Sequence, residues 1–131
     1  MACGMAKAAR VKVFFDGGCR PNPGTMECAV VIGGVAFVRD DLGHGGSHEA
    51  EWRAAIEALR LARERGLRDF VLLGDALAVI AVIEGRTRPR PEAAPLLAAF
   101  EALAGGEKVR VRYVPRGQNL AGVALAKRHP R

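Results

Sequence analysis

The stretch FFDGGCRPNPG, residues 14–24, joins an apolar run to a turn rich in glycine and proline, with Asp16 between them. Residues 10–15, RVKVFF, alternate in polarity and then become wholly apolar, which is typical of a strand that enters a core. The glycines and prolines that follow predict that this strand ends with Asp16 at its tip. Asp16 is then either a turn residue or a side chain held there to bind something.

Two more short strands are predicted directly after this turn. They span residues 26–34 and 35–43, and the Gly33-Gly34 pair between them permits a tight hairpin turn. Together with residues 10–15 they form a three-strand antiparallel meander.

The rest of the chain alternates between helix and strand. Residues 48–65 place Trp52 and other apolar residues on one helical face, with Ser47 as N-cap and Gly66 as stop signal. We expect Trp52 to lie in the core. The later patterns predict a strand at 69–75, helices at 76–85 and 92–106, a strand at 108–116 and a helix at 119–128.

This order of elements predicts an α/β fold with one mixed five-stranded sheet. The meander is antiparallel, two further strands are parallel, and helices cover the faces of the sheet. A chain of 131 residues with 50% hydrophobic composition supports one core, so we expect one domain over residues 1–131, with residues 1–9 flexible.

Composition narrows the functional classes. No apolar run is long enough for a membrane helix, so we expect no membrane association and a cytoplasmic location. The three cysteines lack a metal-ligand spacing, so we expect reduced thiols. We also expect no obligate protein partner. The net charge is +6, and it is unevenly distributed: residues 86–131 carry net +7 and residues 1–85 carry net −1. This excess suits a polyanionic partner such as nucleic acid.

Three acidic residues stand at related places in the predicted fold. Asp16 ends the first strand, Glu51 lies near the start of the first helix, and Asp75 ends the fourth strand. If those strands are parallel neighbours, their carboxyl ends meet where α/β sheets bind ligands. Singly, the three have structural interpretations: a turn residue, a charge that compensates the helix dipole, and an N-cap. Jointly, three like charges require a cation or raised pKa values, and hard oxygen ligands favour Mg²⁺ or Mn²⁺.

Four motifs along nearly the whole chain resemble, in the same order, the type 1 ribonuclease H family: DGGCRPNPG at 16–24, SHEAEWRAAIEAL at 47–59, LLGDALAVI at 72–80 and VPRGQNLAGVALA at 114–126. The resemblance implies a ribonuclease H-like fold and a metal-dependent endonuclease that hydrolyses the RNA strand of RNA–DNA hybrids by two-metal catalysis. It also implies that Asp16 bridges the two metal ions and that Glu51 and Asp75 help to hold one of them.

The resemblance further implies nucleic-acid contacts from Gly17, Gly18, Cys19, Asn22, His48, Arg116 and Asn119. His48 precedes Glu51 by three residues and would face the same cleft, or it is simply a solvated residue at a helix start. Arg86, Arg88 and Arg90 either contact phosphates or form a solvated linker.

One family position is missing from this sequence. The family has a fourth aspartate in its last helix, and alignment on Asn119 places Val123 there. We therefore expect reduced activity. Two alternatives remain open: a non-catalytic nucleic-acid-binding or interaction module with a decayed metal site, and a hydrolase of the same superfold with another substrate.

Overall fold

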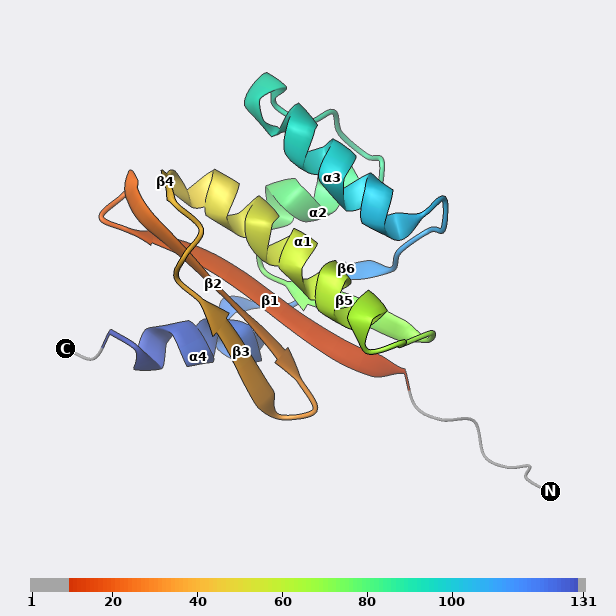
Figure 1. Ribbon diagram of the computed structural model, residues 1–131, viewed down its shortest axis with the longest axis horizontal. Coiled ribbons are helices and arrows are strands. Elements are labelled where there is room, and N and C mark those ends of the chain that lie inside the picture. The colour runs from red at the N-terminus through yellow and green to blue at the C-terminus, as the bar shows by residue number, and fades with distance from the viewer. Residues whose placement is uncertain (1–9, 130–131) are drawn as a thin grey trace.

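The computed structural model describes residues 10–129 as a mixed sheet with helices on both faces (Figure 1). The strands are β1 (Val11–Arg20), β2 (Gly24–Ile32), β3 (Val35–Arg39), β4 (His44–Gly45), β5 (Phe70–Gly74) and β6 (Val111–Tyr113). The helices are α1 (Ser47–Glu64), α2 (Leu77–Ile83), α3 (Ala94–Ala104) and α4 (Leu120–Lys127), with short 3₁₀ turns η1 (Pro91–Ala93) and η2 (Arg116–Gln118). The predicted flexibility of residues 1–9 lies outside the described residues.

The strand order β3-β2-β1-β5-β6 confirms the predicted mixed sheet. β1, β2 and β3 are antiparallel, whereas β1, β5 and β6 are parallel. A sixth strand, β4, pairs with β2 through Gly24–Gly45 and Thr25–His44 and was not predicted. Two residues are too few to show a strand periodicity in the sequence.

The predicted end of the first strand was wrong. β1 continues through Gly17 and Gly18 to Arg20, because these residues remain paired with β2 as far as Arg20↔Thr25. The parallel pairing with β5 ends earlier, at Phe14↔Leu73. Asp16 is therefore not at the tip of β1. It lies where β1 runs past the end of β5.

All four predicted helices are present, with shifted ends. α1 has Gly46 rather than Ser47 as its N-cap residue, and α3 begins only after η1. α3 ends at Gly105, whose φ of 62° is a left-handed conformation that glycine adopts readily. Helix ends depend on such local contacts, which apolar periodicity does not reveal.

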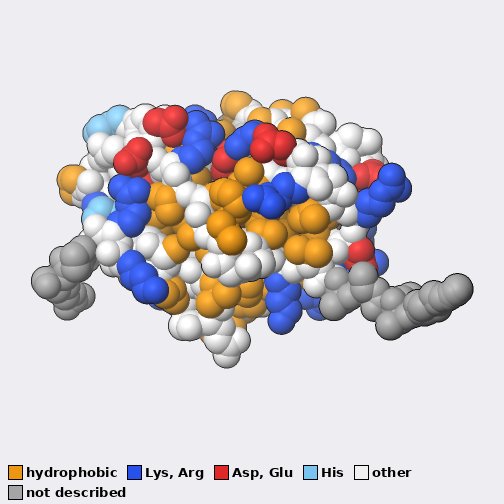
Figure 2. Space-filling model, turned by 60° about the horizontal axis from the view of Figure 1, so that its bottom comes forward, with side chains coloured by type: hydrophobic (Ala, Val, Ile, Leu, Met, Phe, Trp, Pro, Cys, Tyr) orange, Lys and Arg blue, Asp and Glu red, His pale blue; other side chains and the backbone are white. Residues whose placement is uncertain are grey.

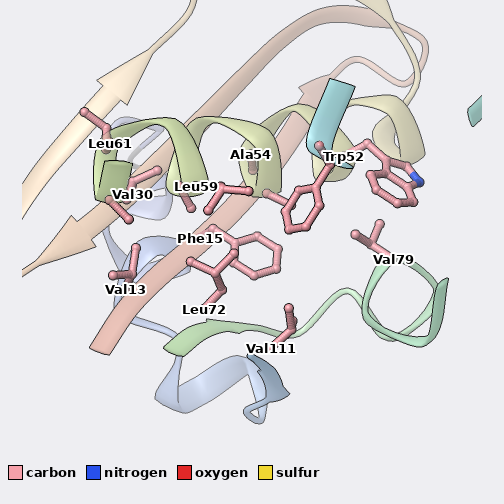
Figure 3. Packing of buried hydrophobic residues seen from close by; sticks show 14 of the residues in the cluster. Val13, Phe15, Val30, Trp52, Ala54, Leu59, Leu61, Leu72, Val79 and Val111 are labelled. Carbon is pink, nitrogen blue, oxygen red and sulfur yellow. The ribbon is translucent and has the colours of Figure 1, made fainter. Parts of the chain in front are cut away.

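The main core lies between the sheet and the α1 face. Trp52 is fully buried there, as predicted, and Figure 3 shows Phe15 of β1 among Leu59 of α1, Leu72 of β5 and Val111 of β6. α4 lies alone on the opposite side of the sheet (Figure 1). Its cluster is much smaller and consists of Ala29, Val31, Ala121 and Leu125.

The α4 side of the molecule keeps apolar surface exposed. Figure 2 shows hydrophobic side chains gathered in the middle of this face, with lysine and arginine side chains around them. Val38 of β3 and Val123 of α4 are among the exposed large hydrophobic residues, at 37% and 41%. Within residues 10–129, no helix is both long and apolar enough to span a membrane.

Candidate active site

Asp16 and Asp75 lie together at the end of the sheet where β5 finishes, and this end is called the acidic edge below. The parallel register pairs Phe14 with Leu73, and each aspartate follows two residues later on its own strand. Gly74 makes this arrangement possible, since a Cβ there would stand 2.6 Å from the ring of Phe15. No larger residue fits under that ring, so a glycine precedes Asp75.

Glu51 reaches the same edge because Gly17 lets α1 approach β1 closely. A Cβ at Gly17 would overlap the carbonyl of Ala50 and stand 2.7 Å from the backbone nitrogen of Glu51. Gly18 is different, since its nearest neighbours would be 3.9 Å away, at Glu27 and Leu125. The structure thus gives Gly17 a packing function beside the acidic residues. The sequence signal for it is a glycine directly after a candidate ligand.

The three carboxylates influence one another. Burial, followed by the negative charge of Asp75, raises the pKa of Asp16 to about 7, with a further contribution from Glu51. Arg116 and a hydrogen bond from the backbone of Gly17 oppose this increase in the pKa of Asp16. Burial and then Asp75 also raise the pKa of Glu51. Such carboxylates require a proton or a cation to relieve their repulsion.

Asn119 connects the site to three elements of the fold. Its side-chain nitrogen donates hydrogen bonds to the Phe15 carbonyl at 3.0 Å and to Asp75 at 2.8 Å, and its side-chain oxygen accepts one from the backbone nitrogen of Ala121 at 3.1 Å. Asn119 is fully buried. The expected nucleic-acid contact of Asn119 is therefore corrected: no surface remains for it, and the residue positions Asp75 and caps α4.

Arg116 stands at the open side of the acidic edge. Its guanidinium Nε lies 3.7 Å from the Asp75 carboxylate, and its side chain is 93% exposed. An exposed, weakly paired arginine beside a cluster of carboxylates is well placed to contact a phosphate.

The start of α1 is held by the turn between β1 and β2. The side-chain oxygen of Asn22 accepts a hydrogen bond from the backbone nitrogen of Ser47 at 3.1 Å, and its amide nitrogen donates to the Ser47 hydroxyl at 3.1 Å. Asn22 thus takes the capping function that was predicted for Ser47. The Cys19 thiol donates to the carbonyls of Pro21 and Gly45. Both side chains stabilise this turn, and Asn22 remains exposed.

His48 faces the acidic edge, as one of the two interpretations of the sequence predicted. Its Nδ1 lies 3.8 Å from a Glu51 oxygen. Burial, followed by the positive charge of Arg90, lowers the pKa of His48 and favours the neutral imidazole. Arg90 lines a hollow of about 380 Å³ together with Asn22 and His48. Arg86 lies instead in a different groove, so the predicted basic loop is divided between two places.

α4 contributes no carboxylate to the site. A Cβ at Gly122 would lie 3.4 Å from an Asp16 oxygen, so α4 passes close to that side chain. Val123, which the alignment on Asn119 predicts to be at the position of the family's fourth aspartate, is 41% exposed.

A divalent cation requires several oxygen ligands held close together. Within residues 10–129, no group of three His, Cys, Asp or Glu side chains is arranged closely enough to hold a metal ion. The predicted ligand set of Asp16, Glu51 and Asp75 therefore stays a prediction; Asp75 also accepts a hydrogen bond from Asn119 and lies 3.7 Å from Arg116. The donor chemistry nevertheless fits, since three hard oxygen ligands share one edge, and burial followed by the charges of Asp75 and Glu51 raises the pKa of Asp16.

Comparisons with known proteins agree with this arrangement. The family model described as reverse transcriptase-like matches residues 15–129. Ribonuclease HI of Halobacterium salinarum is 32% identical over 92% of this chain, and the chain spans 64% of the length of that relative.

Solved structures give the same result. The crystal structure of RNase H1 from Halobacterium salinarum has a TM-score of 0.76 at 29% identity, with 89% of this chain and 94% of that chain covered. LC11-RNase H1, solved in complex with an RNA/DNA hybrid, shares the fold at a TM-score of 0.75 and 22% identity, with 84% and 88% covered. The chain belongs to the reverse transcriptase-like family and, within it, to the type 1 ribonucleases H.

Proposed function

We propose that this chain is a metal-dependent endonuclease that hydrolyses the RNA strand of RNA–DNA hybrids. The observation that carries the proposal is the convergence of Asp16, Glu51 and Asp75 from three separate elements, with the pKa of Asp16 raised to about 7. The ribonuclease H relatives support the reaction, and the hybrid bound to LC11-RNase H1 supports the substrate.

Asp16 is the residue best suited to contact two cations, because the charges of both Asp75 and Glu51 act on it. Glu51 and Asp75 would help to hold one of the two ions. Bound Mg²⁺ or Mn²⁺ would supply an activated water and stabilise the leaving oxygen. Asn119 holds Asp75 in place through its 2.8 Å hydrogen bond, so the ligand oxygen is oriented before any ion arrives.

The substrate would lie across the exposed side chains around this edge. Arg116 offers a phosphate contact beside Asp75, and Arg90 offers one beside His48. A neutral His48 can accept or donate a hydrogen bond without adding charge, which suits contact with a 2′-hydroxyl. Gly18 and Cys19 stay in the proposed nucleic-acid surface through their backbone near the β1–β2 turn. A cytoplasmic location stays a prediction.

A non-catalytic nucleic-acid-binding module is the second candidate, and Val123 is the observation that favours it. A ligand set with one carboxylate fewer binds its second cation less tightly. The same feature predicts reduced hydrolysis if the chain is catalytic.

A cleavage panel tests the proposal. Labelled RNA–DNA hybrid, double-stranded RNA, double-stranded DNA and single strands are each incubated with Mg²⁺, Mn²⁺ or a chelator. We expect cleavage of the hybrid alone, and no cleavage in chelator. Salt-dependent binding without any cleavage would favour the second candidate, and cleavage of another substrate in preference to the hybrid would overturn the assignment of substrate.

A further inference from the structure

We propose that a basic groove binds the phosphate backbone of nucleic acid. The groove lies at the end of the sheet opposite Asp16 and Asp75, so it is separate from the proposed catalytic edge. The groove has a volume of about 790 Å³ and lies between the end of α1, the end of α2 and the starts of β5 and β6. Six of its lining residues are basic: Arg63, Arg68, Arg86, Lys108, Arg110 and Arg112.

The groove keeps unneutralised positive charge. Three acidic residues line it, and each pairs with an arginine: Glu107 with Arg63 at 2.8 Å, Asp69 with Arg110 at 3.4 Å and Glu84 with Arg86 at 2.7 Å. Arg68, Lys108 and Arg112 are exposed, and no carboxylate of residues 10–129 lies within 4.0 Å of their charged nitrogens. Three free cations in one hollow form a site for a polyanion.

The spacing of the basic residues along one lining segment, which include the Asp69-paired Arg110, suits a phosphate backbone. Lys108, Arg110 and Arg112 alternate along the segment that leads into β6, so they share one side, and Val111 between them is buried in the core. Alternate residues of an extended chain are separated by about 6.6 Å, so the three charges span roughly 13 Å. That length is the axial rise of about four phosphates on one strand of a duplex.

An acidic protein is a weaker candidate for the occupant. Protein interfaces are centred on large apolar or aromatic side chains. Among residues 10–129, the exposed large hydrophobic residues are Val35, Val38, Leu77, Tyr113, Leu120 and Val123, and none of them lines the groove. Charge without an apolar centre favours a ligand that is held by its phosphates.

The groove and the catalytic edge are the two ends of β5. Asp69 precedes this strand and lines the groove, whereas Asp75 follows it. Six residues of extended chain span about 20 Å, which is the axial length of about six base pairs. A longer hybrid is therefore needed to reach both places. The inference does not require catalysis, since the groove binds phosphates whether or not the chain cleaves them.

The test compares two triple variants with equal loss of charge. The groove variant carries Arg68→Gln, Lys108→Gln and Arg112→Gln. The control carries Lys12→Gln, Arg65→Gln and Lys127→Gln, three exposed residues that do not line the groove. Binding of a labelled hybrid of about 24 base pairs is measured in chelator by fluorescence anisotropy over a range of salt concentrations, and thermal melting checks that both variants are folded. Hybrids of about five base pairs and poly-glutamate are measured in the same way.

We expect the groove variant to bind the long hybrid at least tenfold more weakly at 0.1 M salt, and the slope of log K against log salt to fall by about 2. The control should keep the slope within about 0.5 of the original. Weakening confined to the long hybrid means that one molecule spans both ends of β5, and equal weakening with short hybrids means that a separate strand occupies the groove; either supports the proposal. Equal slopes for the two variants would overturn it, as would a loss of poly-glutamate binding alone. Hybrid cleavage by the unaltered chain in Mg²⁺, measured separately, shows whether the proposed catalytic function itself fails.

Discussion

Two helices approach Asp16 from opposite faces of the sheet, and they differ in almost every respect. α1 has 18 residues, nine of them buried, and it packs against the main core. α4 has eight residues, with only Ala121 and Leu125 buried. α1 presents Glu51 to the site, whereas α4 brings Gly122 close to Asp16.

This difference shows how the two sides of the site depend on the fold. The α1 side is fixed by a backbone contact at Gly17, so Glu51 cannot shift without moving a large part of the core. The α4 side is held by Asn119 at one end and by His129 at the other, whose Nε2 lies 2.7 Å from Glu27 of β2. Polar links with a small apolar cluster permit adjustment, so changes on this side should be tolerated better.

Removing the shared residue should have the largest effect. Asp16→Asn takes away the carboxylate between both helices, and we expect hybrid hydrolysis to fall by about a thousandfold. Calorimetric titration with Mn²⁺ should also show a larger loss of affinity than for Asp75→Asn, because Asp16 is proposed to contact both ions. Equal losses of affinity in the two variants would contradict the bridging assignment.

Gly17→Ala tests the rigid side directly. Its Cβ would overlap the Ala50 carbonyl, and we expect the free energy of unfolding to fall by about 3 kcal/mol in chemical denaturation. Gly18→Ala is the matched control, since its Cβ would have no neighbour closer than 3.9 Å. Similar unfolding midpoints for both variants would show that α1 can move away from β1 at little cost.

The pH dependence of stability tests the repulsion among Asp16, Glu51 and Asp75. The pKa of Asp16 is raised to about 7 in the folded chain, so its protonated form stabilises the fold at low pH, and this stabilisation is lost as the pH rises toward 7. Without metal, we expect the folded state to lose about 2 kcal/mol between pH 5 and pH 8 from this group.

Thermal and denaturant melts of Asp16→Asn over the same pH range supply the comparison. The variant should show a flatter profile, and added Mg²⁺ should stabilise the unaltered chain more at pH 8 than at pH 5. Identical pH profiles for both chains would mean that the three carboxylates do not repel one another as described.

Val123→Asp alters the adjustable side and should have the smallest effect. If Val123 occupies the position of the family's fourth ligand, a carboxylate there should tighten the second cation and raise hybrid hydrolysis about tenfold. The metal-free melting temperature should drop, because a fourth negative charge joins the site, and Mg²⁺ should restore it. Val123→Asn is the control for size without charge. Unchanged cleavage and melting would show that α4 carries no ligand position at residue 123.

The sequence predicted the order of elements and the convergence of three acidic residues, because apolar periodicity and strand ends are local signals. It did not predict that β1 continues to Arg20, since glycines signal a turn unless a partner strand keeps them paired. β2 supplies that pairing, and it is a tertiary contact.

The functions of Asn22 and Asn119 were also beyond local signals. Both were expected to contact nucleic acid, which stays a prediction for the exposed Asn22. The structure shows that Asn22 also caps α1 from a distance of 25 residues, and that Asn119 bonds Phe15 from 104 residues away. A polar residue within a family motif gives the same sequence signal whether it binds a ligand or holds the site together. Burial reveals the second function for Asn119, and the hydrogen bonds to Ser47 reveal it for the exposed Asn22; both observations require the fold.

Cys28, in the middle of β2, gives this chain an internal reporter of unfolding. It is fully buried, and burial together with the charge of Glu57 raises the pKa of its thiol to about 12. A thiol-directed reagent requires the exposed thiolate, so it should label Cys28 only in molecules whose central strands have separated. The rate of labelling at this one sulfur would then count opening events of the sheet under native conditions, without denaturant and without any need for enzymatic activity.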